Sequence, residues 1–461
     1  MSLPQPENVT TLDEGSSHLE LRTLGHATLV ICENSEPLIA TDPWLLGSVY
    51  WRSWWLEQYP TEQEMDLVAN ARYVYVTHSH PDHFHPPTLR HLGKPKTLHP
   101  DLPYYPVPQY LRDNGIPAET LSPLRWYRLT ENVSVMSILS FLDDSILLID
   151  TPDALVVNMN DANPSKQLLT TLREQLPPKK NVIVLKSYSP ASAAVATYRN
   201  GSHAPLKDKQ AYVRRAEEIA TTLGATHYVP FASHAFFSRN DSRWANEHKV
   251  TYEDLRTYWS QDSITLCRPF SHVDLATGEH MQAGKPTPSS VQQAHLEKVE
   301  LREQTEAEFS LPADFPKRLA DYLDSVPFLR LLFRNGLGFR LTTSGAEWFY
   351  STRKKSVVET LPVSADVVVS LPDKVLYEAL VNGILTDLGI TMLIRVDTRV
   401  DVRRSYAFFS LMGLRDYGYS RGARSVATCA LLYAPYVLPR LRKKQFVRGL
   451  QGPAARMPQF T

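Results

Sequence analysis

The fold is decided by the stretch Ala71-Arg72-Tyr73-Val74-Tyr75-Val76-Thr77-His78-Ser79-His80-Pro81-Asp82-His83. It starts as a β-branched and aromatic run, typical of a strand, and ends with three imidazoles and a carboxylate within six residues. Because side chains two apart on an extended chain point to one face, His78 and His80 can bind the same ion. Pro81 turns the chain, so that Asp82 and His83 can reach a second ion. Imidazole and carboxylate suit zinc, iron or manganese, and the stretch therefore predicts a metal site.

This pattern, His-x-His-x-Asp-His after an apolar strand, resembles the metallo-β-lactamase fold family over roughly residues 18 to 245. The resemblance implies an α/β protein built as an αββα sandwich, with the metals at one edge. It also implies that Asp42, in Thr41-Asp42-Pro43, lies beneath the metal site; a strand-end turn is the alternative. Gly25-His26-Ala27-Thr28 recurs in the family too, and His26 is either a packed strand histidine or a residue of the cleft.

A narrower resemblance rests on Asp42-Pro43-Trp44-Leu45-Leu46-Gly47, on Trp51-Arg52-Ser53-Trp54-Trp55-Leu56 and on Pro230-Phe231-Ala232. These segments are similar to those of the CMP-N-acetylneuraminate hydroxylase family, in which a metallo-β-lactamase-like domain is joined to a Rieske iron–sulfur domain. Trp51, Trp54 and Trp55 are large rigid aromatics that either wall a substrate cleft beside the metals or pack in the core.

The remaining ligands are assigned through the resemblance. Asp161 follows an apolar strand, which is where the fold places its metal-bridging aspartate; a turn before Pro164 is the alternative. The last ligand of the fold is a histidine at the end of a later strand, which selects His234 over His227 because His227 stands at the start of that strand.

One departure from the hydrolytic members of the fold bears on the reaction. They carry a further histidine between the main motif and the bridging aspartate, and this chain has no histidine between His99 and His203. Asp143 and Asp144 stand there instead, which resembles the diiron oxygenases of the fold. A polar β-turn with two solvated carboxylates is the alternative.

Composition limits the kinds of partner. Lys plus Arg equals Asp plus Glu at 49 each, so no overall field draws the protein to nucleic acid, and a small molecule is the expected partner. Cys32, Cys267 and Cys429 form no metal-binding motif, which fits a reducing compartment. We find no signal sequence and no run of apolar residues long enough for a transmembrane segment, and therefore expect a cytoplasmic protein.

At 461 residues the chain exceeds one ordinary domain. Thr61 and Glu64 form a capping box for a helix that runs to Ala71, and a second helix is expected from Asp208 to Leu223. We expect a catalytic domain over 18–270, a polar connector over 271–304, an α+β accessory domain faintly like the sterol-carrier type over 305–446, and a basic, solvated tail over 447–461.

The leading hypothesis is a dinuclear non-haem iron oxygenase that hydroxylates a small metabolite with dioxygen. His78, His80 and one of Asp143 and Asp144 would hold one iron. Asp82, His83 and His234 would hold the other. Asp161 would bridge the two, with Asp82 and Asp161 as the catalytic residues. Arg199 is a candidate anion clamp for the substrate.

The electron source and the metal remain open at this point. The chain has no Rieske-type Cys-x-His pairs, so electrons are expected from a separate ferredoxin-like or reductase partner. The alternative hypothesis is a hydrolase of the same fold, in which two zinc ions activate water to attack an ester, lactone or phosphodiester.

Overall fold

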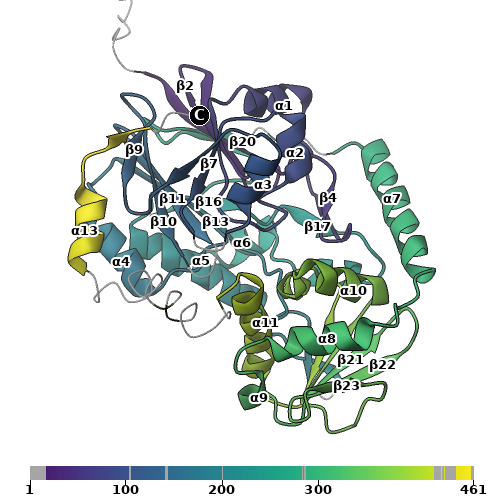
Figure 1. The fold of residues 1–461 in the computed structure, drawn as a ribbon. Helices are drawn as coiled ribbons and strands as arrows, with labels where there is room; N and C mark the ends of the chain where they lie inside the picture. Colours follow the sequence, from purple (N-terminus) through teal and green to yellow (C-terminus); the bar gives the residue numbers. More distant parts are fainter. Residues whose placement is uncertain are drawn as a thin grey trace, which may run out of the picture.

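The computed structural model describes residues 17–102, 105–140, 144–199, 201–282, 284, 287–419, 427, 430 and 443–457. Two stacked sheets form the larger domain, and helices cover their outer faces (Figure 1). The first sheet has the order β20 (His280–Gln282), β19 (Ser271–Asp274), β1 (Leu19–Leu24), β2 (Thr28–Glu33), β3 (Glu36–Thr41), β6 (Tyr73–Tyr75), β7 (Thr97–Pro100) and β8 (Ala118–Leu121). The second has the order β18 (Thr265–Leu266), β16 (His227–Phe231), β13 (Asn181–Ser187), β12 (Ala154–Asn160), β11 (Ser145–Asp150), β10 (Ser134–Leu139), β9 (Trp126–Arg128) and β26 (Ala455–Arg456).

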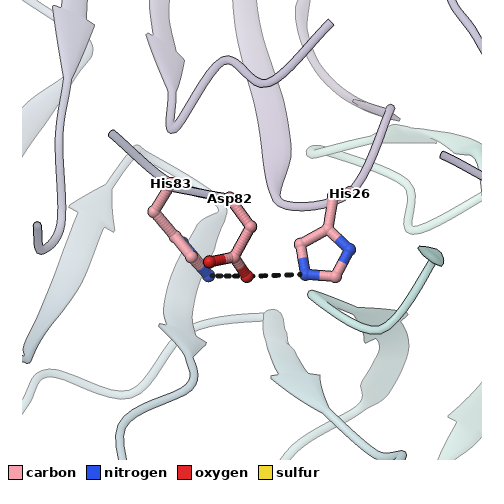
Figure 2. Close-up of side chains that lie close together, drawn as sticks. All are labelled: His26, Asp82 and His83. Atoms are coloured by element: carbon pink, nitrogen blue, oxygen red, sulfur yellow. Dashed lines mark ion pairs between the residues drawn. The ribbon is translucent and has the colours of Figure 1, made fainter. Parts of the chain in front are cut away.

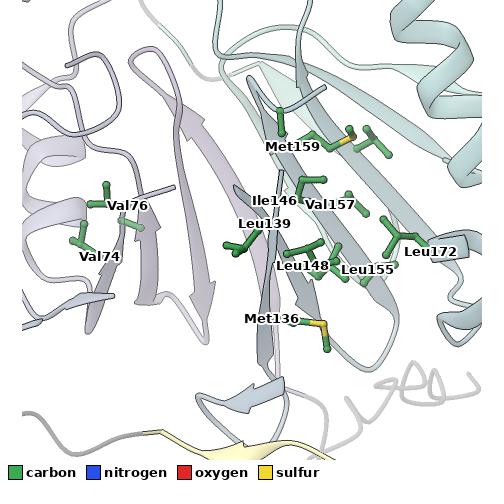
Figure 3. Packing of buried hydrophobic residues seen from close by; sticks show 14 of the residues in the cluster. Val74, Val76, Met136, Leu139, Ile146, Leu148, Leu155, Val157, Met159 and Leu172 are labelled. Atoms are coloured by element: carbon green, nitrogen blue, oxygen red, sulfur yellow. The ribbon is translucent and has the colours of Figure 1, made fainter. Parts of the chain in front are cut away.

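Successive side chains of a strand point in turn to the space between the two sheets and to the outer helices. Leu147 and Ile149 of β11 pack between the two sheets, whereas Ile146 and Leu148 point to the helical side, where Figure 3 shows them. The outer helices are α1 (Glu62–Ala69), α2 (Pro86–His91) and α3 (Val107–Asp113) on the first sheet, and α4 (Lys166–Gln175), α5 (Lys209–Leu223) and α6 (Tyr252–Tyr258) on the second. The expected αββα sandwich is therefore confirmed.

The two sequence-predicted helices are confirmed with their caps. Thr61 and Glu64 form the capping box of α1, and the helix ends at Ala69. Asp208 caps α5, which stops at Gly224 in the left-handed conformation that glycine adopts most readily.

A smaller C-terminal domain follows. Its sheet has the order β15 (Ser202–His203), β14 (Thr197–Arg199), β25 (Arg395–Thr398), β24 (Val367–Leu371), β21 (Leu337–Leu341), β22 (Glu347–Ser351) and β23 (Ser356–Val358). Its helices are α8 (Phe315–Asp324), α9 (Leu329–Leu332), α10 (Asp373–Asn382), the 3₁₀ turn η2 (Leu385–Gly389) and α11 (Val402–Asp416). Because β14 and β15 come from the first half of the chain, this sheet joins the two domains.

The expected domain boundaries need two corrections. Residues 271–304 are not a polar connector, because β19 and β20 extend the first sheet and α7 (Ser289–Ala307) is a long helix beside both domains (Figure 1). The predicted tail over residues 447–461 is packed against the first domain up to residue 457. Helix α13 (Lys443–Gln451) buries Phe446 and Leu450 in the core of that domain, and β26 pairs with β9.

A short sheet beside α7 completes the list of elements, with β17 (Ala235–Phe237), β5 (Trp54–Leu56) and β4 (Ser48–Val49), followed by the 3₁₀ helix η1 (Arg243–His248). No helix among the residues described above is both long and apolar enough to cross a membrane.

Candidate metal centre

The candidate site lies at one edge of the sandwich, where several strands end together. Parallel strands β3 and β6 end just before Asp42 and the His78 to His83 motif, and β12 of the second sheet ends just before Asp161. Because the carboxyl ends of β3 and β6 meet at the same edge, residues far apart in the sequence come together there.

Asp42 fixes the orientation of His83. The Asp42 carboxylate is fully buried, and it accepts hydrogen bonds from the Thr77 backbone N–H (2.7 Å) and from the Thr77 hydroxyl (2.6 Å). Its Oδ2 atom also lies 2.9 Å from Nδ1 of His83. A histidine that donates through Nδ1 to a carboxylate presents Nε2 to a metal, so this contact agrees with the prediction that Asp42 lies beneath a metal site, which stays a prediction.

Histidines and aspartates gather around that Nε2 atom. His83 Nε2 lies 3.4 Å from an oxygen of Asp82 and 3.4 Å from an oxygen of Asp161. The same Asp82 oxygen lies 3.3 Å from Nε2 of His26, as Figure 2 shows. The rings of His78 and His83 are 4.0 Å apart at their centroids. All these groups except Asp161 are almost completely buried.

Among the described residues, three groups of side chains have donor atoms within 4.8 Å of one another, the reach of a single ion. They are His78, His80 and Asp144; His26, Asp82 and His83; and His78, His83 and Asp161. Two separate groups joined by a third are the arrangement that a dinuclear centre needs.

Buried ring nitrogens without partners test whether a metal fits. Nε2 of His78 and Nδ1 of His26 are buried and make no hydrogen bond in the described part of the chain, and Nε2 of His83 and of His26 are buried with carboxylate oxygens 3.3–3.4 Å away. A buried polar atom left unpaired costs about 1–3 kcal/mol, and native proteins avoid it. Metal coordination satisfies such nitrogens, so the residues present fit a metal-binding site.

Ser145 ties the three ligand-bearing segments together. Its hydroxyl donates to the carbonyl of Thr77 (2.7 Å), and its own carbonyl accepts from the Asn160 side chain (2.9 Å). Ser145 starts β11 directly after Asp144, and the Ser140 N–H donates to the Asp144 carbonyl (2.7 Å). Asp144 lies within reach of His78 and His80. The second candidate, Asp143, lies outside the described residues.

Burial and charge set the protonation of the metal-free cluster. Burial lowers the pKa of His26, and burial together with the neighbouring His83 lowers that of His78 well below its usual value. Burial opposes the charge of His83 as well, but the carboxylates of Asp82 and Asp42 outweigh it and raise the pKa of that ring well above its usual value. In the metal-free protein, the positive charge of a protonated His83 thus takes the place that a metal cation would have between these carboxylates.

His234 is not in the cluster, contrary to the sequence-based prediction. Its Nε2 lies 3.0 Å from the carbonyl of Pro230, and its Nδ1 lies 3.7 Å from the carboxylate of Glu57. Ala232, two residues earlier, adopts a left-handed φ of 46°, which turns the chain away from the strand direction. His26, in the turn between β1 and β2, stands beside Asp82 and His83 instead.

The turn that carries His26 is held from two sides. The His26 carbonyl accepts from the Ala232 N–H (3.0 Å), and the Thr28 hydroxyl donates to the carbonyl of Asp42 (3.1 Å). The signal in the sequence was Gly25-His26-Ala27-Thr28 itself, in which Gly25 has a left-handed φ of 62°. The sequence left His26 undecided because a turn histidine shows no periodicity.

A cavity of about 610 Å³ opens beside the cluster. Ligand candidates line it (His80, Asp82, Asp144 and Asp161), with Tyr50, Trp54, Lys186 and Tyr188 around them. Lys186 is buried, and burial lowers its pKa to about 8 although Asp161 and Asp144 act in the opposite direction. The cavity is large enough for a small-molecule substrate.

Only part of the predicted substrate-binding set borders this cavity. Trp54 does, and its ring centroid lies 5.9 Å from that of His26. Trp51 instead donates from Nε1 to Glu378 of the C-terminal domain (2.7 Å), and Trp55 is buried against His295, with ring centroids 4.1 Å apart. Arg199 is exposed at the end of β14, where it pairs with Thr398, and is not among the residues that line the cavity.

A family model agrees with this geometry. Residues 20–184 match the model described as the β-lactamase superfamily domain, and this range contains β2 to β12 and the candidate ligands His26 to Asp161. This part of the chain is therefore similar to β-lactamase superfamily domains. The predicted fold resemblance is thus confirmed, and in the structure the sandwich extends past residue 184 to β20.

Curated relatives and solved structures give further similarities. The chain is 23% identical over 262 residues to cytidine monophosphate-N-acetylneuraminic acid hydroxylase of Danio rerio, which covers 53% of this chain and 42% of that protein. It is 29% identical over 141 residues to the protein of the same name from Asterias rubens, covering 28% of this chain and 21% of that one. The chain thus spans less than half the length of these relatives. Among solved structures, CmlA, a diiron β-hydroxylase from Streptomyces venezuelae, is similar with 16% identity, 61% coverage of this chain, 55% of that one, and a TM-score of 0.38.

Proposed function

We propose that this protein is a hydroxylase with a dinuclear non-haem iron centre, which oxidises a small molecule with dioxygen. The observation that carries the proposal is the pair of mixed ligand groups: two imidazoles with Asp144 at one position, and two imidazoles with Asp82 at the other. Carboxylate-rich sites suit iron that changes oxidation state and keeps a position open. The names of the curated relatives, which are hydroxylases, support the same reading.

The ligand assignment follows from the groups. His78, His80 and Asp144 would hold one ion, His26, Asp82 and His83 would hold the other, and Asp161 stands where it can bridge them. When bound, the metal pair would supply the activation of dioxygen; the residues of this chain would supply everything else.

Each surrounding residue has a distinct task under this proposal. Asp42 keeps the tautomer of His83 fixed, so that Nε2 faces the ions. Tyr50, whose hydroxyl donates to Asp82 over 2.6 Å, holds that carboxylate in one orientation. Trp54 and Tyr188 line the cavity with aromatic surface, which excludes water and orients a substrate. Lys186 offers a cationic N–H group at the cavity wall.

Electrons would come from a separate partner of the ferredoxin or reductase type. In the test, iron-loaded protein is reduced chemically without oxygen, mixed with buffer that contains dioxygen, and followed with an oxygen electrode and by absorption. Rapid oxygen uptake at up to one dioxygen per two irons supports the proposal. Asp161→Ala protein treated identically is the control and should show only the slow rate of free iron.

Oxygen uptake no faster in the wild type than in Asp161→Ala would contradict an oxygenase. Activity of zinc-loaded protein on p-nitrophenyl esters or bis(p-nitrophenyl) phosphate would then favour the metal-dependent hydrolase of the same fold.

A further inference from the structure

A tyrosine side chain of the C-terminal domain contacts one of the predicted metal ligands. The hydroxyl of Tyr417 lies 3.0 Å from Nε2 of His80, and the two rings are 6.5 Å apart at their centroids. Tyr417 directly follows α11 of the C-terminal domain, 337 positions from His80 in the sequence. A residue outside the sandwich therefore contacts one of the metal ligands predicted within it.

The neighbouring residue fixes Tyr417 in place. The carboxylate of Asp416 accepts from the hydroxyl of Tyr322 (2.7 Å) and from the backbone N–H of Thr386 (2.9 Å), which ties the end of α11 to α8 and η2. Leu414 and Tyr417 themselves pack against the core of the first domain. Tyr417 is thus anchored to its own domain through Asp416 and to the sandwich through its own packing.

The hydrogen bond decides which nitrogen of His80 serves a metal. Under the proposed ligand set, Nε2 of His80 keeps its contact with the Tyr417 hydroxyl, and we assign Nδ1, on the other side of the ring, to the ion shared with His78 and Asp144. A hydrogen bond to the non-coordinating nitrogen also fixes the rotation of the ring.

Tyr50 makes a comparable contact with a predicted ligand of the second ion, from another part of the chain. Its hydroxyl donates to Asp82, and it belongs to a run of three left-handed residues, Tyr50, Trp51 and Arg52, with φ of 52°, 54° and 63°. Arg239 donates to the Trp51 carbonyl (3.1 Å) and stabilises this unusual turn. Each predicted metal position thus has its own tyrosine.

We propose that Tyr417 is a positioning residue for His80, and that the C-terminal domain is by this contact a part of the metal centre rather than an independent module. The inference rests on the proposed metal ligands. In this proposal the Tyr417 hydroxyl positions His80, a ligand of the ion shared with His78 and Asp144. The Tyr50 hydroxyl positions Asp82, a ligand of the ion shared with His26 and His83.

The test is a titration of the metal-free full-length protein with Co²⁺, followed by visible absorption in the presence of a competing chelator. Loss of an outer hydrogen bond to a metal-bound histidine typically costs 10–100-fold in affinity. Tyr417→Phe should therefore bind one Co²⁺ normally and the other about 10–100-fold more weakly. Tyr50→Phe should also weaken one Co²⁺, with a different change of spectrum because the other ion is affected.

Two further variants separate positioning from domain packing. Tyr322→Phe removes a hydroxyl that anchors Asp416 but leaves the Tyr417 hydroxyl itself in the protein, and it should weaken the ion held by His78, His80 and Asp144 less than Tyr417→Phe does. In a His80→Ala background, Tyr417→Phe should have no further effect on the remaining ion. Thermal unfolding of the metal-free variants checks that each is folded.

Two results would overturn the inference, and a third would overturn the proposed function on which it rests. Tyr417→Phe that binds both ions with wild-type affinity would show that the hydrogen bond has no role in coordination, while the metal centre itself would stand. Equal weakening in Tyr322→Phe would mean that domain docking, not the hydroxyl, is responsible. A wild-type protein that binds no Co²⁺ would instead refute the proposed function, which makes the two failures distinguishable.

Discussion

Replacing Asp42 by Asn tests whether the Asp42 carboxylate holds His83 in the tautomer that can bind a metal. Asp42 accepts three hydrogen bonds, two from Thr77 and one from Nδ1 of His83, and two of the three end on its Oδ2 atom. An amide can keep the acceptor for the Thr77 N–H, and its nitrogen can donate to the Thr77 hydroxyl. It cannot accept from His83 at the same position, so His83 loses the group that fixes its tautomer.

The magnitude follows from that single lost contact. If the His83 proton moves to Nε2, the nitrogen that faces Asp82 and Asp161 can no longer bind a metal. We expect a loss of about 10–100-fold in affinity for one ion, which is roughly 1.4–2.8 kcal/mol. The metal-free protein should also lose about 2 kcal/mol of unfolding free energy, because a hydrogen bond to a buried charge is worth about 1.5–3 kcal/mol.

The assay is a metal titration against a chelator, together with urea unfolding of the metal-free protein. Asp153→Asn is the matched control, since Asp153 is exposed in the turn between β11 and β12 and should change neither quantity. If Asp42→Asn binds both ions with wild-type affinity, the proposed role of Asp42 is refuted.

Three further changes give separate expectations. Asp144→Ala should release one of two metals, measured by elemental analysis after dialysis, whereas full retention would mean that the turn is structural. His234→Ala should keep both metals, because His234 contacts Pro230 and Glu57 rather than the cluster; loss of one metal would restore it as a ligand. Lys186→Met should remove a pH dependence of stability in the metal-free protein. The pKa of Lys186 falls from 10.5 to about 8 on folding, so the folded protein binds fewer protons between these values, and the wild-type unfolding free energy should rise with pH over that window. An identical pH profile in both proteins would contradict this.

The sequence predicted the parts of the site that one strand and its following turn contain. His78, His80, Asp82 and His83 lie within six residues, so local geometry alone brings them together. Asp161 was predicted through the family resemblance, as a carboxylate directly after a buried strand. The sandwich was predicted through the same resemblance, because strands such as β12 are buried along their whole length and show no alternation of burial.

The sequence analysis selected His234 over His227 and left His26 open between a packed histidine and a cleft residue, because the positions of these side chains depend on tertiary structure. His26 reaches the site only because β2 pairs with β3 and places its turn against Asp42. His234 points elsewhere because Ala232 adopts a left-handed conformation, which no local pattern predicts for alanine.

The packing of the C-terminal segment against the first domain could not be predicted from the sequence for a similar reason. Phe446 and Leu450 are spaced as one face of a helix, but the basic residues around them suggested a solvated tail. Their burial depends on a groove formed by residues more than three hundred positions earlier, as the Trp126 hydrogen bond to the Leu450 carbonyl (2.9 Å) shows. The resemblance of the C-terminal domain to a sterol-carrier domain stays a prediction.

The central claim is that this chain holds two irons in one coupled centre. Its most direct test is elemental analysis and Mössbauer spectroscopy on the same sample, taken from protein expressed in iron-supplemented medium. We predict about two irons per chain, with the spectrum of an antiferromagnetically coupled diferric pair that is absent in Asp161→Ala. Zinc at the same stoichiometry despite the iron supplement, or iron present only as isolated mononuclear ions, would contradict the account.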